Sequence, residues 1–212
     1  MNTAIIGMGN IGARIAKNLV AGGEKIVVAD RTLAKAQKVA AELGSNATAA
    51  TVADAIGKAD IVVLAIYFDA IKDLVAQFRN ELRGKIVVDP SNPIAPDGKG
   101  GFKKTIPLEQ SSGQLLSELL PGDTELVKAF GTLAASSLES GANRSPERAV
   151  LFYASEYPEA GKAVAKLIAA SGFTPMSVGG IAKSIRIEVF GDLNEFGTLG
   201  KLVSAKEAAA LV

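Results

Sequence analysis

The feature that most constrains this chain is a glycine triplet near its start, set between an apolar run and a helical pattern. The glycines follow the apolar residues 4–6 with the spacing G-x-G-x-x-G, and they are Gly7, Gly9 and Gly12. Apolar residues then recur one helical turn apart, at Ile11, Ile15 and Leu19. The order is strand, tight turn and helix, which is the opening unit of a dinucleotide-binding fold.

Each part of this unit has an expected role. Gly7 permits the turn, Gly9 lets the backbone approach a pyrophosphate, and Gly12 lets the helix pack close to the strand. The free N–H groups of the first helical turn would face the phosphates. A second apolar run, residues 25–29, ends in Asp30 about 20 residues after the glycines, where an acidic partner for a ribose hydroxyl belongs. The alternative is a strand–helix turn whose glycines serve packing only.

The composition excludes several classes of chemistry. The 212 residues are 48% apolar and 21% charged, as in an ordinary globular protein. A net charge of +1 gives no electrostatic reason to expect nucleic acid or an acidic membrane as a partner. The chain has no cysteine and no histidine, which removes disulfides, thiolate metal sites and imidazole catalysis. We expect no metal site.

The sequence also carries expectations about location and assembly. The longest wholly apolar run, residues 61–68, is too short to span a bilayer, and the amino terminus lacks the basic region of a signal peptide. We therefore expect a cytoplasmic protein with a small-molecule partner. The prevalence of symmetric dimers among soluble proteins predicts a homodimer.

Strand and helix patterns alternate along the chain, which predicts a Rossmann-type, doubly wound parallel sheet of the α/β class. The expected strands are 4–6, 25–29, 47–50, 61–66, 85–88, 125–130, 149–153 and 173–178. The first expected helix follows the glycine triplet and ends before Gly22. The other expected helices cover 32–43, 52–58, 69–82, 111–121, 158–171, 181–190 and 201–211. Residues 181–190 also fit a strand. We predict a dinucleotide-binding domain over 1–135 and a small mixed α/β extension over 136–212.

Two irregular stretches leave alternatives open. Residues 90–101 contain three prolines and three glycines, so they are neither a helix nor a central strand. They form either a functional loop beside a strand end or a surface excursion. The polar stretch 136–148 is either a lid or a disordered connection. Lys99, Lys103 and Lys104 either meet a phosphorylated acceptor or belong to a solvated loop.

With these features the chain resembles the NADPH-dependent F420 reductase-like oxidoreductases, also called F420-dependent NADP oxidoreductases, and the related reductase domain of STEAP metalloreductases. The resemblance covers nearly the whole chain. It rests on the turn GMGNIG, the strand end VVADR, the segments KIVVDPSNP and LVKAFGTL, and the closing FGDLNEFGTLG.

The resemblance implies that a nicotinamide dinucleotide passes a hydride to a flavin or deazaflavin stacked against it. NADP is the expected coenzyme with NAD as the alternative, and F420, FMN or FAD is the expected acceptor. Carried over by position, the pyrophosphate would lie on Gly7, Met8, Gly9, Asn10, Ile11 and Gly12. The adenosine ribose would face Asp30, Arg31, Thr32 and Lys35. The nicotinamide would be bordered by Ala65, Ile66, Tyr67, Asn92, Pro93, Phe130, Gly131, Thr132 and Leu133. The extension would close the acceptor site with residues 190–196.

The chain departs from its relatives at two of these positions. NADP-specific relatives tend to carry a small hydroxyl residue in place of Asp30, whose carboxylate would repel a 2′-phosphate. Arg31 and Lys35 are nevertheless suited to a phosphate. Gly131 stands where relatives usually have asparagine or histidine.

Hydride transfer between two rings needs no protein acid or base, so we expect no catalytic side chain. Tyr67 is either a proton donor or an aromatic wall. The alternative functions are reduction of a small carbonyl or imine, a non-catalytic dinucleotide-sensing module and, less favoured, a methyltransferase. Pyrroline carboxylate reductases, which represent the imine alternative, dimerise through a helical C-terminal domain, whereas this C-terminus has predicted strands.

Overall fold

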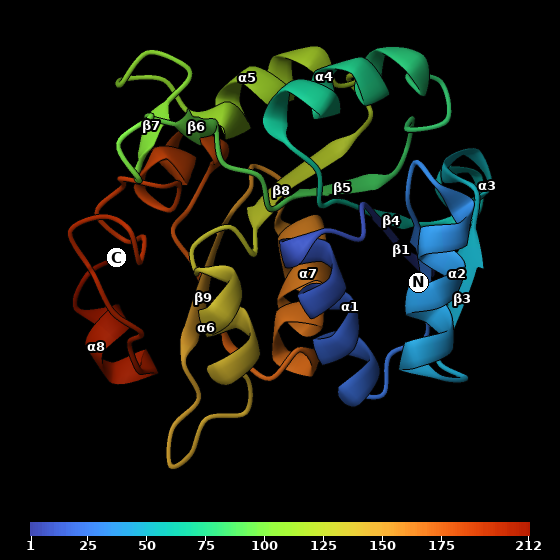
Figure 1. Ribbon diagram of the computed structural model, residues 1–212. Helices are drawn as coiled ribbons and strands as arrows, with labels where there is room; N and C mark the ends of the chain where they lie inside the picture. The colour runs from blue at the N-terminus through green and yellow to red at the C-terminus, as the bar shows by residue number, and fades with distance from the viewer.

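One eight-stranded sheet runs through the computed structural model, which describes all 212 residues (Figure 1). The strands lie in the order β10-β9-β8-β5-β4-β1-β2-β3. They are β1 (Thr3–Ile6), β2 (Ile26–Ala29), β3 (Ala47–Ala50), β4 (Ile61–Leu64), β5 (Ile86–Asp89), β8 (Glu125–Ala129), β9 (Val150–Ala154) and β10 (Thr174–Ser177). All neighbours are parallel except β8 and β9. The predicted Rossmann-type α/β class is confirmed.

The topology reverses between β1 and β4, since the chain first winds toward β3 and then continues on the other side of β1. Every residue of β1, β4 and β5 is buried, which is the pattern of strands covered on both faces. Ile5 pairs with Val28 of β2 and with Val63 of β4. The ends of β1 and β4 therefore border the crevice where ligands of such sheets bind.

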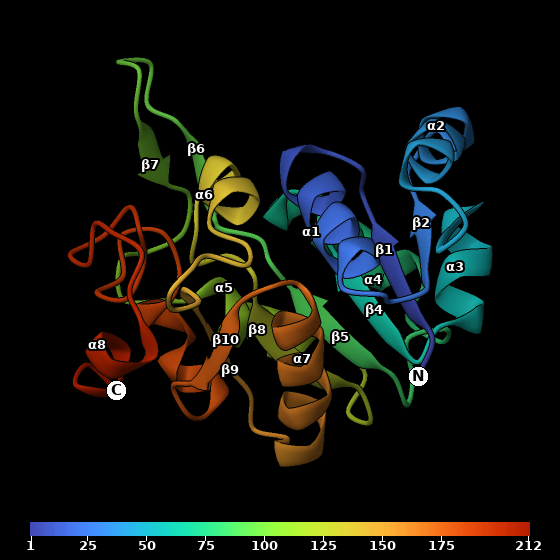
Figure 2. The same cartoon turned by 90° about the horizontal axis from the view of Figure 1, so that it is seen from below.

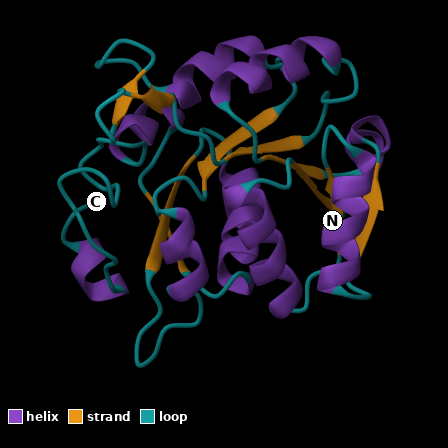
Figure 3. Cartoon of the chain, viewed as in Figure 1, coloured by secondary structure: helices purple, strands orange, loops and turns teal.

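Helices cover both faces of the sheet, so the sheet forms the middle of three layers (Figure 3). They are α1 (Asn10–Ala21), α2 (Leu33–Leu43), α3 (Val52–Lys58), α4 (Phe68–Gln77), α5 (Ser112–Leu119), α6 (Ala135–Ser140), α7 (Pro158–Ala170), the 3-10 helix η1 (Ile181–Arg186) and α8 (Ala205–Ala209). Helices α1, α2, α6 and α7 pack into one apolar core, and α3, α4 and α5 into the other. None of the helices is long and apolar enough to cross a membrane.

Three predicted helices differ from the structure by more than three residues at one end. Helix α4 starts at Phe68, with Tyr67 and not Asp69 at the cap position, and Phe68 is buried together with Ile71. It ends at Gln77, and turns follow to Gly84. Only 181–186 of the predicted helix 181–190 is helical, as a 3-10 turn. The final helix is Ala205–Ala209, and its start is set by a capping box between Ser204 and Glu207.

Both irregular stretches contain regular structure that the sequence analysis missed. The strand β6 (Ile94–Pro96) lies within 90–101 and pairs with β7 (Phe102–Lys104), and this hairpin projects from the body of the molecule (Figure 2). Helix α6 occupies the first part of 136–148 and buries Leu138 against the core. A disordered connection is therefore the wrong interpretation for this part. Glu139 adds ion pairs to Arg14 and Lys17 of α1.

The predicted division at residue 135 stays a prediction. Strands β9 and β10 lie beyond it and continue the same sheet. The carboxyl-terminal segment is a mixture of strands and helices, as expected.

Candidate functional site

The glycine turn at the end of β1 has little free space at two of its three glycines. Gly7 has a φ of 98°, which favours glycine. A methyl group on Gly12 would overlap the Gly7 carbonyl oxygen and lie 2.9 Å from the Ala65 Cβ. By contrast, no atom lies within 4 Å of the position where Gly9 would carry a side chain. The turn is thus tightly packed toward the sheet and open on the outside at Gly9.

The start of α1 presents unpaired hydrogen-bond donors at this open position. The backbone N–H groups of residues 9–12 form no hydrogen bond within the protein. The helix has no side-chain cap, and Gly9 itself is exposed. Four adjacent donors at the positive end of a helix dipole form a site suited to an anion.

Asp30 at the end of β2 is attached to the same turn. Its Oδ2 accepts a hydrogen bond from the Met8 N–H at 2.8 Å and lies 3.1 Å from the Lys35 Nζ. Partial burial raises the pKa of Asp30, but the hydrogen bonds from Met8, Lys35 and Thr32 outweigh this and hold it below its usual value. Arg31 and Thr32 are exposed beside it. A carboxylate, an ammonium and a guanidinium therefore lie together at the end of β2.

Ala65 and Ile66, at the end of β4, lie against the glycine turn. A side chain on Gly7 would come within 2.5 Å of the Ala65 oxygen and the Ile66 Cγ2. Tyr67 is 84% exposed and precedes α4. Since β4 neighbours β1, these residues continue the same edge of the sheet toward β5 and β8.

The loops after β5 and β8 are joined through Asn92. Its Nδ2 donates to the Gly131 oxygen at 3.0 Å, and its Oδ1 accepts from the Val189 N–H at 2.7 Å. A side chain on Gly131 would lie 2.8 Å from the Pro90 oxygen, which explains why a larger residue is absent there. Both ends of the Asn92 amide are thus engaged within the protein.

Two hydroxyl groups in these loops have no partner. The Oγ of Ser91 and the Oγ1 of Thr132 are buried and form no hydrogen bond, although buried polar atoms are normally paired. Ser91 follows β5 and Thr132 follows the adjacent strand β8. Pro93 and Leu133, close to them in the sequence, are buried as well. Phe130 is buried too and has a φ of 65°, which is strained for a bulky residue. Unused polar capacity and backbone strain thus occur together at these strand ends.

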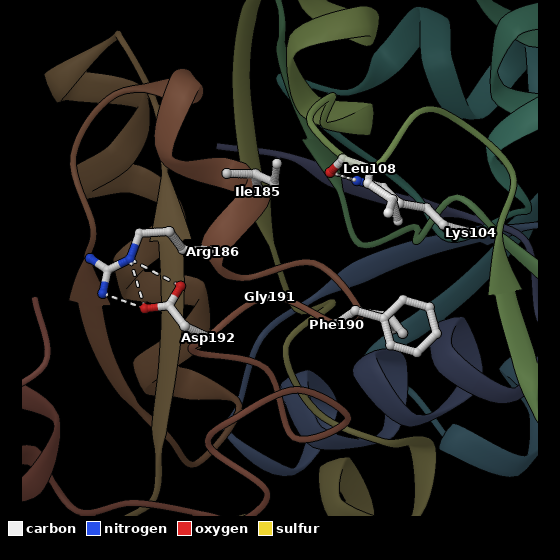
Figure 4. Close-up of a pocket in the computed structure, with 8 residues that line it drawn as sticks. Lys104, Leu108, Ile185, Arg186, Phe190, Gly191 and Asp192 are labelled. Atoms are coloured by element: carbon white, nitrogen blue, oxygen red, sulfur yellow. Dashed lines mark hydrogen bonds and ion pairs between the residues drawn. The ribbon is translucent and has the colours of Figure 1, made fainter.

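A cavity of about 330 Å³ lies between the hairpin side of the molecule and the segment after η1 (Figure 4). Phe190 lines it, is 48% exposed and has a φ of 74°. On the opposite side of the view, Arg186 forms a two-pronged ion pair with Asp192 at 2.7 and 3.0 Å, which raises the Arg186 pKa (Figure 4). The cavity is lined by Lys104, Leu108, Ile185, Arg186, Val189, Phe190, Gly191 and Asp192.

Of the three lysines in the hairpin segment, Lys104 has an internal role. Its Nζ donates to the carbonyl oxygens of Leu108 at 2.9 Å and Gln110 at 2.5 Å. Lys99 and Lys103 remain exposed. Lys104 is therefore not simply part of a solvated charged loop, because two of its three donors are bonded within the segment.

The sequence analysis missed a buried group of charges below the strand ends. Asp89, Lys128 and Glu188 are each no more than 1% exposed. The Lys128 Nζ donates to the Asp89 Oδ2 at 2.6 Å, and the Glu188 carboxylate lies 3.7 Å from it. The available signal was a charged residue inside the apolar runs around Lys128 and Glu188 and at the end of the run before Asp89, because buried charges occur mainly where they are paired.

Comparison with known proteins finds similarity to reductases. Residues 2–93 match the family described as NADP oxidoreductase, coenzyme F420-dependent. Metalloreductase STEAP3 of Rattus norvegicus is 29% identical over 184 residues, which are 87% of this chain and 35% of that protein. The F420-dependent NADP reductase of Methanothermobacter thermautotrophicus is 29% identical over 148 residues, covering 65% of this chain and 64% of that protein.

A solved structure of a hypothetical protein from Sinorhizobium meliloti is similar over nearly its full length. It is 32% identical, with a TM-score of 0.84, and the match covers 96% of this chain and 95% of that one. The predicted resemblance to F420-dependent NADP oxidoreductases and the STEAP reductase domain is confirmed. The chain spans about a third of the STEAP3 relative and less than two thirds of the F420-dependent one.

Proposed function

Because the chain is a relative of the F420-dependent NADP oxidoreductases, we propose that it transfers a hydride between a nicotinamide dinucleotide and a flavin-like or deazaflavin acceptor. NADPH is the favoured coenzyme and F420, FMN or FAD the acceptor. Small-molecule partners agree with the net charge of +1, which gives no electrostatic reason to expect a nucleic acid or an acidic membrane. A cytoplasmic homodimer is part of the proposal, on the base rate of symmetric assemblies.

The observation that carries the proposal is the set of four unpaired N–H groups at residues 9–12. They would hold the pyrophosphate, and the open side of Gly9 would let it approach the backbone. The unpaired hydroxyls of Ser91 and Thr132 would meet polar groups at the nicotinamide end. These features fit a dinucleotide extended from the end of β2, past β1 and β4, to the ends of β5 and β8.

The coenzyme supplies a hydride from its reduced nicotinamide ring, and the protein supplies position and electrostatics. A bound acceptor would take up the hydride, and solvent would supply a proton where the acceptor's chemistry requires one. Phe190, which lines the 330 Å³ cavity, would stack with an acceptor ring. No side chain needs to act as an acid or base at the reacting carbons.

The alternative of imine reduction has less support. The segment after residue 136 contributes β9 and β10 to the central sheet, and α7 packs on that sheet. It does not form the all-helical domain expected for a pyrroline carboxylate reductase.

The first test is a titration of the protein with NADPH and, in parallel, NADH. The chain has no tryptophan, so the fluorescence of the reduced coenzyme can be followed without protein emission from that residue. We expect saturable binding. Acceptors are then compared by the loss of the reduced coenzyme's absorbance. If neither coenzyme binds at millimolar concentration, the proposal is wrong.

Replacing Asp30 tests the coenzyme preference. We expect Asp30→Ser to raise the ratio of NADPH to NADH affinity by on the order of tenfold, because a carboxylate that repels the 2′-phosphate is removed while Lys35 is freed. The measurement is the same titration with both coenzymes. Asp97→Ser is the matched control, since Asp97 also accepts backbone hydrogen bonds, from Lys99 and Gly101. An unchanged ratio would mean that Asp30 points away from the ribose in the complex.

A further inference from the structure

The buried charges below the strand ends form a completely paired network. The Lys128 ammonium donates three hydrogen bonds. They go to the Asp89 Oδ2 at 2.6 Å, the backbone carbonyl oxygen of Ser91 at 2.6 Å and the Ser112 Oγ at 2.8 Å. The Ser112 hydroxyl in turn donates to the Glu188 Oε1 at 2.9 Å. Ser112 thus connects the ammonium to the second carboxylate, and no partner of Lys128 is water-exposed.

Glu188 is attached to the first turn of α5. Its Oε2 accepts from the Ser112 N–H at 3.0 Å and its Oε1 from the Gly113 N–H at 3.0 Å. A carboxylate at the start of a helix is favoured by the helix dipole and by the unpaired N–H groups there. This explains how the network holds two carboxylates and one ammonium without solvent. It also fixes the residues that follow Glu188 relative to α5.

The positions of the network in the sequence connect it to the proposed site. Phe130 comes two residues after Lys128, and Phe190 comes two residues after Glu188. Both phenylalanines have a left-handed backbone, with φ values of 65° and 74°. Of the non-glycine residues, only these two and Asn143 have positive φ, and strained backbone of this kind persists only where the surroundings impose it.

A second contact holds Phe190 from the adjacent residue. The Val189 N–H donates to the Asn92 Oδ1 at 2.7 Å, and Asn92 is itself bonded to Gly131. Beyond Phe190, the Asn194 Nδ2 donates to the carbonyl oxygens of Gly131 and Ile187. Phe190 is therefore an exposed aromatic residue on a backbone that is fixed on both sides.

We propose that Asp89, Lys128 and Glu188, with Ser112, are positioning residues that hold the Phe190 ring where an acceptor ring can stack. This rests on the proposed function for the role of the ring. The network touches neither reactant. It acts by fixing the backbone of residues 188–190 against α5 and against the loops after β5 and β8. Misplacement of a reacting group by about 1 Å costs up to two orders of magnitude in rate.

The direct test uses the lack of natural tryptophan. Phe190→Trp introduces a single tryptophan at the exposed position, and time-resolved fluorescence anisotropy reports its local motion. We expect the indole to rotate with the whole protein. Adding Glu188→Gln should introduce a fast component, because the amide cannot accept from both backbone N–H groups and the serine hydroxyl. Ser112→Ala, which removes only the connecting hydroxyl, is the milder variant if Glu188→Gln does not fold.

The control in the same background is Glu156→Gln. Glu156 also accepts a backbone hydrogen bond, from the Ile181 N–H at 2.8 Å, but at the other end of η1. It should leave the tryptophan immobile. A tryptophan that stays immobile in the folded Glu188→Gln and Ser112→Ala variants would overturn the proposal, as would equal mobility in the control.

Kinetics give the second readout, in the protein with Phe190 intact. Glu188→Gln should lower turnover by on the order of tenfold or more at saturating coenzyme, with the coenzyme dissociation constant unchanged. A loss of coenzyme affinity equal to the loss of turnover would contradict a positioning role. The anisotropy measurement needs neither coenzyme nor acceptor. Failure of the wild-type protein to bind a coenzyme would therefore overturn the proposed function separately.

Discussion

Gly9→Asp is expected to abolish coenzyme binding while leaving the fold intact. The new carboxylate would lie at the open side of the glycine turn, where the unpaired N–H groups of residues 9–12 face outward. Two like charges 4 Å apart repel by about 4 kcal/mol at the effective dielectric of a protein surface, and a pyrophosphate carries two charges. We expect the dissociation constant for NADPH to rise by on the order of a hundredfold or more, measured by fluorescence titration.

The space around Gly9 makes this variant a clean test. No atom lies within 4 Å of the position of its Cβ, so a side chain there displaces nothing. Gly57→Asp is the matched control, because Gly57 in α3 has equally open surroundings and receives the same charge. The control should bind the coenzyme as the wild type does. Unchanged affinity in a correctly folded Gly9→Asp protein would rule out the glycine turn as the phosphate site.

Lys128→Met is expected to destabilise the protein by about 3–5 kcal/mol, because it leaves the carboxylate of Asp89 buried without its cation. Glu188 keeps its N–H partners at α5 but loses the positive charge 3.7 Å away. The measurement is urea unfolding followed by circular dichroism. Lys162→Met is the surface control. Its ion pair with Glu159 is exposed, and its loss should hardly move the unfolding midpoint.

A double variant separates charge from packing. Lys128→Met combined with Asp89→Asn removes one charge of each sign from the network, so part of the lost stability should return. If the double variant is as unstable as the single one, the lost stability comes from the packing of the methionine and not from the uncompensated carboxylate. In that case the network would not be electrostatic in origin.

Local sequence signals were enough to predict the sheet and most of its helices. The strand β3 and the helix α3 have the predicted bounds. A short apolar run predicts the strand, and the cap at Thr51 marks the start of the helix. The helix after residue 68 and the final helix were predicted too long. Helix α4 stops at Gln77 although Leu82 beyond it is buried, and α8 begins only after the buried Val203, so apolar periodicity does not mark where either helix ends. The hairpin β6–β7 was missed, since a run rich in proline and glycine carries no strand pattern and only pairing between its two halves creates one.

Some features of the candidate site were likewise predictable from the sequence, and others were not. The glycine turn and Asp30 lie within one βαβ unit, so their spacing alone predicted that they meet, and the Met8 N–H does bond to Asp30. The roles of Asn92 and Gly131 were not visible, because the bond between them joins residues 39 positions apart. Nothing in the sequence indicated that Lys104 bonds to two carbonyl oxygens of the segment that follows it.

The sequence by itself determined the fold class, the glycine turn between β1 and α1 and the resemblance to F420-dependent NADP oxidoreductases, since all three follow from local periodicity and short motifs. Only the tertiary structure decided that Asp89, Lys128 and Glu188 form one network and that Phe190 is held in a strained, exposed position. The physical reason is that a buried charge is tolerable only with partners, and the two carboxylates paired with Lys128 lie 39 and 60 residues from it in the chain. Pairing across such separations is set by the packing of the sheet, and no local pattern encodes it.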